Sequence, residues 1–253
     1  MIKLSGLSKK YGDNFVVKNA NALFPKGEIT AIIGPNGAGK STLLSMASRL
    51  THSDAGQILI GDKLLAEWDT KELAKHLAVL RQSNNINMRF TVRELVSFGR
   101  FPHSQGRLTA ADNIIIDSAL SQLDITDIKD RYLDQLSGGQ RQMAFIAMVV
   151  AQDTDYIFLD EPLNNLDIKH SVEIMQNLHQ LATKLNKAVV IVIHDINFAV
   201  SYADNIIAMK KGEVIKSGKI AEVAQQEIME EIYEIPFSIQ EVNGKKVCLY
   251  FNN

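Results

Sequence analysis

The stretch Gly34-Pro35-Asn36-Gly37-Ala38-Gly39-Lys40-Ser41 fits the pattern G-x-x-x-x-G-K-[ST]. It follows a strand-like apolar run, residues 29–33, and precedes the helical pattern of residues 42–50. Glycines there let consecutive backbone N–H groups surround a triphosphate, and the helix N-terminus adds partial positive charge. We expect Lys40 to bridge the β- and γ-phosphates of ATP and the Ser41 hydroxyl to bind Mg²⁺, with Thr42 completing the contacts. The full motif with these flanks makes a plain glycine-rich turn the weaker interpretation.

Two carboxylates follow another apolar run, residues 156–159, and are therefore expected at the carboxyl end of a buried strand. Asp160 is predicted to hold Mg²⁺, and Glu161 to polarise the attacking water as general base. His194 ends the apolar run 188–193, and Gln82 follows the strand-like residues 78–80. Taken alone, His194 and Gln82 are more often structural, although either can reach the γ-phosphate, the water or Mg²⁺.

Composition limits the class of protein. The 253 residues are 46% hydrophobic, and 27 basic against 29 acidic side chains leave a net charge of −2, which does not favour nucleic acid. Cys248, the one cysteine, excludes an internal disulfide and fits a reducing compartment, where a small apolar role in a late strand is expected. The longest apolar run, residues 143–151, is shorter than the roughly 18 residues of a membrane helix, and the start of the chain is not typical of a signal peptide. We expect a cytosolic protein unless a partner tethers it.

The pattern along the chain predicts one α/β domain, residues 1–253, with a mixed sheet and flanking helices. Strands are expected at 15–17, 29–33, 57–60, 78–80, 156–159 and 188–193, around one long helix that starts near Ser41. Residues from about Ile86 to 155 have helical periodicity, with capping boxes predicted at Thr91-x-x-Glu94 and Thr109-x-x-Asp112. A crossover helix at 168–185, a helix at 227–233 and a hairpin at Asn243-Gly244 complete the prediction.

Leu136-Ser137-Gly138-Gly139-Gln140 lies between the phosphate loop and the two carboxylates. Ser137 is expected to cap a helix whose two glycines leave the backbone accessible, which makes a second anion site. This string resembles the signature of ATP-binding-cassette (ABC) proteins, and the resemblance covers nearly the whole chain. It implies a phosphate-loop NTPase of ABC type, in which residues 1–85 and 156–253 form the core with an antiparallel β part. Residues 86–155 would form an inserted helical subdomain.

The resemblance also implies roles for single residues. The signature would bind the γ-phosphate of ATP held by a partner copy, so hydrolysis would need a homodimer. Tyr11 would stack on adenine, although a tyrosine at 11 can also simply pack against a turn. Gln82 would be the loop glutamine that links the site to a membrane permease dimer, Asp167 would close the loop after Glu161, and His194 would be the switch histidine.

Within the family, Phe98-Gly99-Arg100-Phe101-Pro102-His103 is similar to a G-R-x-P-H element of importers for iron chelates and cobalamin, although it can also be a helix end stopped by Pro102. Residues 104–109 and 163–167 look most like ferric-siderophore ATPases. Two departures are Met143, where many relatives carry arginine, and Asn164-Asn165, which replaces a commoner small or hydroxyl pair. We expect neither to touch the nucleotide chemistry directly, and we hypothesise that the Asn pair alters communication between subunits.

The expected function is an ATPase that energises import of an iron(III)-siderophore complex from the cytoplasmic face of the membrane. The membrane permease would be its direct partner, and an extracytoplasmic substrate-binding protein an indirect one. Import of cobalamin or heme, energised by the same kind of ATPase subunit, is an alternative. A soluble cassette protein acting on DNA or ribosomes usually carries a long coiled coil or tandem cassettes, and the chain has no sustained heptads. A small-molecule kinase shares the phosphate loop but would not need the signature.

Overall fold

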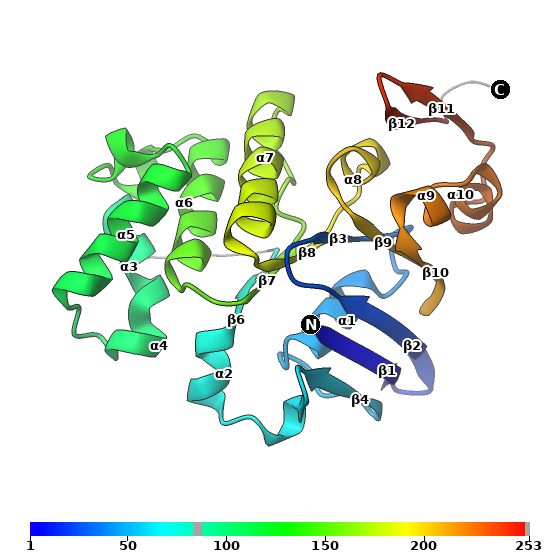
Figure 1. Cartoon of the computed structure of the whole chain (residues 1–253), viewed down its shortest axis with the longest axis horizontal. Coiled ribbons are helices and arrows are strands. Elements are labelled where there is room, and N and C mark those ends of the chain that lie inside the picture. Colours follow the sequence, from blue (N-terminus) through cyan, green and yellow to red (C-terminus); the bar gives the residue numbers. More distant parts are fainter. Residues whose placement is uncertain (83–87, 251–253) are drawn as a thin grey trace.

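A six-stranded sheet forms the centre of the computed structural model, which describes residues 1–82 and 88–250 (Figure 1). Its strand order is β10-β9-β3-β8-β7-β6, in which β10 is antiparallel to β9 and the other neighbours are parallel. The strands are β3 (Ile29–Ile33), β6 (Leu77–Leu80), β7 (Tyr156–Asp160), β8 (Ala188–Val192), β9 (Asn205–Lys210) and β10 (Glu213–Lys219). All residues of β3 and β8 are buried, which explains their continuous apolar runs and confirms the predicted strands.

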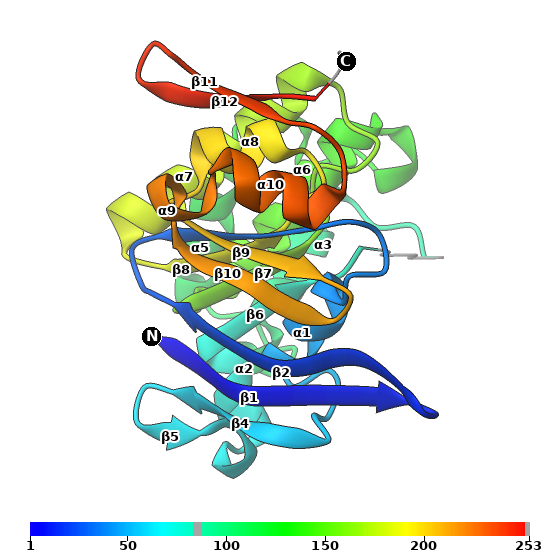
Figure 2. The ribbon, with the colours of Figure 1, turned by 90° about the vertical axis from the view of Figure 1, so that its right-hand side faces the viewer.

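A four-stranded antiparallel sheet, in the order β2-β1-β4-β5, lies on one side of the central sheet (Figure 2). It is made of β1 (Ile2–Tyr11), β2 (Asn14–Phe24), β4 (Ala55–Ile60) and β5 (Lys63–Leu64). Helix α1 (Lys40–Ala47) contributes Leu43 and Leu44 to the core that the two sheets share. In that core the Phe24 and Phe158 rings meet edge to face, with centroids 5.5 Å apart.

Short helices dominate the segment that the sequence predicts to be helical. They are α3 (Val92–Ser97), η2 (Phe98–Arg100), α4 (Phe101–Ser104), α5 (Ala110–Gln122), η3 (Thr126–Ile128), η4 (Leu133–Gln135) and α6 (Gly138–Ala151). Both predicted capping boxes are present, at Thr91 with Glu94 and at Thr109 with Asp112. The predicted start at Ile86 lies outside the described residues. Division of the chain into a core and an inserted subdomain stays a prediction.

The remaining elements cover the other side of the central sheet (Figures 1 and 2). They are α7 (Ile168–Leu185), α8 (Ile196–Tyr202), α9 (Ile220–Val223), α10 (Gln226–Tyr233), β11 (Ser238–Val242) and β12 (Lys245–Leu249). The predicted hairpin at Asn243-Gly244 is confirmed, because β11 pairs with β12 there. Cys248 is fully buried in β12, and the Asn197 amide bonds to its backbone N–H and C=O over 2.8 and 3.2 Å.

Several N-terminal predictions are wrong in detail. The strand at 15–17 is part of the longer β2, and β1 was missed because register shifts after Leu4 and Leu7 break its alternating pattern. The helix after the phosphate loop is not long: it ends at Ala47, since Arg49 is in the left-handed region with φ of 59°. Helix α2 (Thr70–His76), capped by the Asp69 side chain, and η1 (Leu65–Glu67) were also missed.

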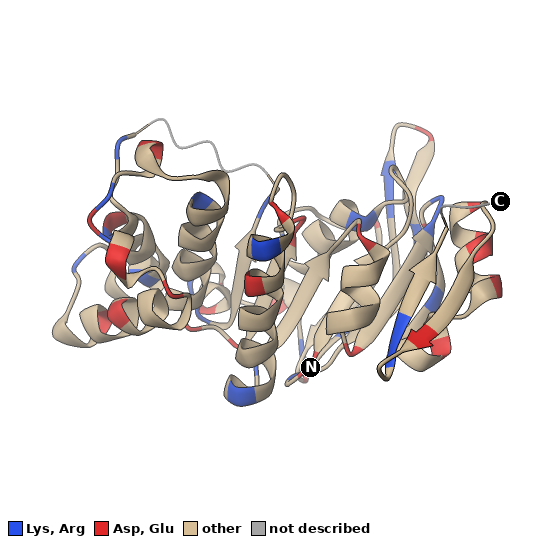
Figure 3. Cartoon of the chain, turned by 90° about the horizontal axis from the view of Figure 1, so that it is seen from above, with Lys and Arg blue, Asp and Glu red and all other residues tan. Residues whose placement is uncertain are grey.

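The distribution of charged residues and the hydropathy of the helices agree with what the composition predicts. Lys and Arg lie among Asp and Glu over the visible face (Figure 3). Across residues 1–82 and 88–250, no helix has the length and apolar character needed to cross a bilayer.

Candidate nucleotide-binding site

Four neighbouring parallel strands end at one edge of the central sheet. In sheet order they are β3, β8, β7 and β6, which lead into Gly34, His194, Glu161 and Gln82. Carboxyl ends of parallel strands meet at the same edge, so residues separated by up to 160 positions in the sequence become neighbours. The expectation that His194 and the carboxylates share this edge is therefore confirmed.

The phosphate loop curls tightly before α1. Gly39 has φ of 94°, and a Cβ there would lie 2.4 Å from the Val16 carbonyl oxygen, so only glycine fits. The Lys40 ammonium is buried and donates to the carbonyl oxygens of Gly34 and Pro35 over 2.9 and 3.0 Å. Burial lowers the pKa of Lys40, and the charges of Glu161 and Asp160 oppose that shift. A buried cation that donates hydrogen bonds to neutral carbonyls is well suited to a polyanionic ligand.

Ser41 and Asp160 form a pair of oxygen ligands beside the loop. Ser41 Oγ donates to Asp160 Oδ1 over 2.8 Å. Burial raises the pKa of Asp160, while the bond from Ser41 opposes the shift. Mg²⁺ prefers oxygen ligands and is usually held by one or two protein groups plus substrate phosphates, so this pair fits Mg²⁺ bound with ATP. No cluster of three or more His, Cys, Asp or Glu ligands occurs among the described residues, and such a site does not need one.

The Glu161 carboxylate is the centre of a hydrogen-bonded cluster. Gln82 Nε2 donates to Glu161 Oε2 over 2.5 Å, and His194 Nε2 lies 2.5 Å from Oε1. A third side chain, Asn164, also donates from Nδ2 to Oε2. The Glu161 backbone is in the left-handed region with φ of 52°, while its N–H bonds to the Val192 carbonyl over 3.1 Å. A backbone conformation that costs about 1 kcal/mol or more is thus held in place at this residue.

The contact from Asn164 to Glu161 was not expected from the sequence, which predicts that the Asn pair does not touch the nucleotide chemistry directly. Asn164 lies in the turn after β7, where its backbone N–H bonds to the Glu161 carbonyl over 3.3 Å. Met143 is buried in the hydrophobic core, and the expectation that it does not touch the nucleotide chemistry stays a prediction.

Tyr11 ends β1 at the turn to β2, and the residue is 56% exposed. More than half of its surface is therefore not covered by packing against the turn. The Lys9 ammonium lies 5.6 Å from the ring centroid. The neighbouring strand β2 brings Val16 against Gly39, so this hairpin borders the phosphate loop.

The signature string begins α6, as predicted. Ser137 is the N-cap: its Oγ accepts from the Gln140 N–H, and the Gln140 side chain accepts from the Ser137 N–H, both over 3.2 Å. Ser137 and Gly138 are exposed. Helix α6 packs against α3 and α5, whereas α1 packs against β2, β7 and β8, so the signature and phosphate loop belong to different layers.

His170 is a residue that sequence reasoning missed. It lies in the first turn of α7, where Asp167 is the N-cap, and His170 Nδ1 is 2.8 Å from Asp167 Oδ1. The bond from the His170 backbone N–H, followed by the bond from its ring, lowers the pKa of Asp167. The ring packs so closely on the signature helix that a Cβ at Gly139 would lie 2.6 Å from it. His170 therefore links the predicted Asp167 to the signature.

The G-R-x-P-H element binds parts of the helical segment together. A Cβ at Gly99 would lie 2.1 Å from the Met148 carbonyl oxygen, so η2 and α6 need glycine to approach. Arg100 is buried and bonds to Asp112 Oδ1 and to the Ala151 carbonyl, both over 2.9 Å. The alternative of a helix stopped by Pro102 is wrong, because Pro102 lies at the start of α4.

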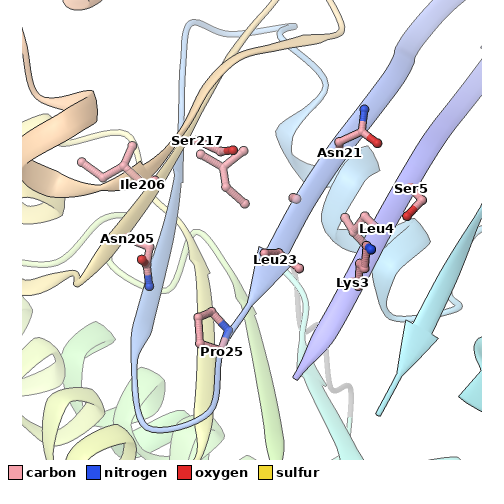
Figure 4. Close-up of a pocket in the computed structure, with 12 residues that line it drawn as sticks. Lys3, Leu4, Ser5, Asn21, Leu23, Pro25, Asn205, Ile206 and Ser217 are labelled. Atoms are coloured by element: carbon pink, nitrogen blue, oxygen red, sulfur yellow. The ribbon is translucent and has the colours of Figure 1, made fainter. Parts of the chain in front are cut away.

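A cavity of about 410 Å³ lies between β1 and β2 on one side and β9 and β10 on the other (Figure 4). None of the residues predicted to bind ATP lines it. A smaller cavity of about 210 Å³ does border the site, with Glu161, Asn164 and His194 in its wall.

The phosphate loop, the paired Ser41 and Asp160, and the capped N-terminus of α6 define a phosphate-loop ATPase that carries the signature string at the start of a second helix. Residues 17–164 match the family model described as ABC transporter, and the chain belongs to this family. The petrobactin import ATP-binding protein YclP of Bacillus subtilis (strain 168) is 54% identical over 252 residues, which cover 100% of both chains.

Other relatives give the same family. The petrobactin import ATP-binding protein FatE of Bacillus anthracis is 46% identical and covers 94% of this chain and 96% of its own. A dimeric bacterial ABC transporter cassette of known structure has a TM-score of 0.77 and 32% identity, and covers 87% of this chain and 99% of its own. The inward-facing structure of a metal-chelate type ABC transporter has a TM-score of 0.87 at 24% identity. The match covers 99% of this chain and 97% of that chain, which shows a shared fold.

Proposed function

We propose that the chain is the ATP-hydrolysing subunit of a transporter that imports an iron(III)-siderophore complex. The observation that carries the ATPase role is the convergence of the phosphate loop, Asp160, Glu161, Gln82 and His194 on one sheet edge. The importer role is supported by the relatives, which are named as import ATP-binding proteins for petrobactin and iron(3+)-hydroxamate.

The residues divide the work of hydrolysis. Lys40 and the backbone N–H groups of residues 36–42 hold the phosphates, and Tyr11 offers an exposed ring to adenine. Ser41 and Asp160, with Gln82, would hold Mg²⁺, which supplies positive charge to the β- and γ-phosphates when bound with ATP. Glu161 takes the proton of the attacking water, and His194 orients the water and the γ-phosphate.

Two copies of the chain would form a head-to-tail homodimer. The signature, Leu136 to Gln140, of which Ser137 and Gly138 are exposed, lies in a different layer from the phosphate loop of its own chain. It would therefore bind the γ-phosphate of ATP on the partner copy, with Asp167 joining the two sites across the interface. The dimeric cassette of 32% identity supports the formation of a dimer.

In this proposal the dimer docks on the cytoplasmic face of a membrane permease dimer, and an extracytoplasmic binding protein delivers the chelate. ATP closes the two chains and hydrolysis reopens them, so the transporter changes conformation without contact between this chain and its cargo. Gln82, bonded to Glu161, would carry the nucleotide state to the permease.

The test of the ATPase role compares purified variants. We expect Lys40→Ala to abolish ATP turnover, and Glu161→Gln to bind ATP and accumulate as a stable dimer without hydrolysis, because the amide cannot act as base. Lys216→Ala, at an exposed position of β10, is the matched lysine control and should hydrolyse ATP normally. Full turnover by Glu161→Gln would contradict the assigned base.

The test of the cargo is uptake of radioactive iron, presented as several chelates, by cells whose copy carries Glu161→Gln. Selective loss for one siderophore supports the proposal and names the substrate. Unchanged iron uptake would redirect the search to cobalamin or heme, and then to cassette proteins that do not transport.

A further inference from the structure

The Glu161 carboxylate receives more side-chain donors than the predicted machinery requires. Gln82 and His194 bond to it from the residues that follow β6 and β8, and the Asn164 amide donates to Oε2, the oxygen that Gln82 also contacts. A carboxylate has about four acceptor positions. Three are occupied by protein donors, which leaves about one for the proton of an attacking water.

The loop that carries Asn164 is fixed at both ends. Asn164 N–H bonds to the Glu161 carbonyl and Leu166 N–H bonds to the Leu163 carbonyl, each over 3.3 Å. The Leu163 and Leu166 side chains pack on the main hydrophobic core. The left-handed backbone at Glu161 turns the chain so that a side chain three residues later reaches back to the carboxylate. Asn164 is thus a donor delivered by the same loop as its acceptor, whereas Gln82 comes from a different part of the chain, after β6.

We propose that Asn164 is a positioning residue for hydrolysis: it fixes the orientation of the Glu161 carboxylate toward the attacking water. The inference rests on the proposed role of Glu161 as general base. Asn164 does not need to touch ATP for this purpose. Without its amide the Glu161 side chain keeps Gln82 and His194 as donors but gains rotational freedom, and a misplaced base slows the chemical step without weakening nucleotide binding.

An alternative is that Asn164 only stabilises the turn after β7. That role would lower the melting temperature and leave the turnover number unchanged in the folded fraction. A role in binding would raise the KM for ATP. The split between kcat and KM therefore separates positioning from both alternatives.

The experiment measures steady-state ATP hydrolysis by the purified chain, with its permease if the isolated chain is inactive. We expect Asn164→Ala to lower kcat about tenfold, the effect of one hydrogen bond to a charged group, with the KM for ATP within about twofold. The isosteric Asn164→Asp keeps the size but replaces the donor with a carboxylate, so we expect a drop of about a hundredfold. Gln176→Ala removes an exposed amide on α7 and should match the unmodified protein.

Glu161→Gln, measured beside these variants, separates the two proposals. If Glu161→Gln is inactive and Asn164→Ala has a kcat within twofold of the unmodified protein, the positioning role is wrong while the function stands. A raised KM with unchanged kcat would equally refute it. If Glu161→Gln hydrolyses ATP, the assigned base is wrong and the inference fails with it. Should Asn164→Ala fold poorly, the isosteric Asn164→Asp decides alone: turnover equal to the unmodified protein would overturn the inference.

Discussion

Replacing Arg100 by methionine should destabilise the protein far more than the same change at Arg93. Arg100 and Asp112 are each 7% exposed at the side chain and lie 2.9 Å apart, and Arg100 also donates to the Ala151 carbonyl at the end of α6. Arg100→Met leaves a buried carboxylate without its cation and a backbone carbonyl without that donor. Breaking a buried pair by removing one partner costs about 3 to 5 kcal/mol.

Arg93 provides the control within the same helical segment. It pairs with Asp117 on α5, but its side chain is 30% exposed and that of Asp117 is 58% exposed. Surface pairs contribute roughly 0 to 1 kcal/mol, so Arg93→Met should have little effect. For a chain of this size 1 kcal/mol moves the melting temperature by about 2 to 4 °C, so we expect Arg100→Met to melt roughly 10 °C lower.

The assay is thermal and urea unfolding followed by circular dichroism, with Arg100→Met/Asp112→Asn as the double variant. Because the double variant has no unpaired charge, we expect it to be more stable than the sum of the single changes predicts. If Arg100→Met and Arg93→Met melt within 2 °C of each other, the structural role assigned to the buried pair is wrong.

Three further predictions concern Asp112, Gly99 and His170. Hydrogen bonds from Thr109, followed by that from Arg100, lower the pKa of Asp112 from 3.8 to about 2. The ionised carboxylate therefore stabilises the fold above pH 3.8, and about 2 kcal/mol of this stability is lost as the pH falls through 2, so Asp112→Asn should flatten acid unfolding curves in that range. Gly99→Ala should cost about 1 to 3 kcal/mol in urea titrations, because its Cβ would lie 2.1 Å from the Met148 carbonyl oxygen; stability equal to the unmodified protein would contradict this close approach. His170→Ala removes the ring that packs on Gly139, so we expect slower ATP turnover with unchanged ATP affinity, and unchanged turnover would show that the ring does not position the signature.

Much of the fold followed from pattern because buried parallel strands are continuous apolar runs. Residues 29–33, 156–159 and 188–193 could be recognised in this way, and the groups that follow each run then had to share one edge of the sheet. Strand β1 could not be recognised, because its bulges between Leu4 and Lys9 break the period of two. Helix α2 is only seven residues long, too short for a clear helical period.

The contacts of Asn164 and His170 depend on three-dimensional geometry that no spacing rule expresses. Asn164 reaches Glu161 only because the intervening backbone turns through a left-handed residue, which for a glutamate is an unfavourable conformation that sequence statistics do not predict. His170 reaches Gly139 because α6 and α7 pack side by side, although 30 residues separate them. Both residues lie within nine positions of Glu161. The segment after β7 supplies both a donor to the proposed base and a ring to the signature helix. In the proposed dimer, a change in one nucleotide site would therefore have a short covalent route to the other.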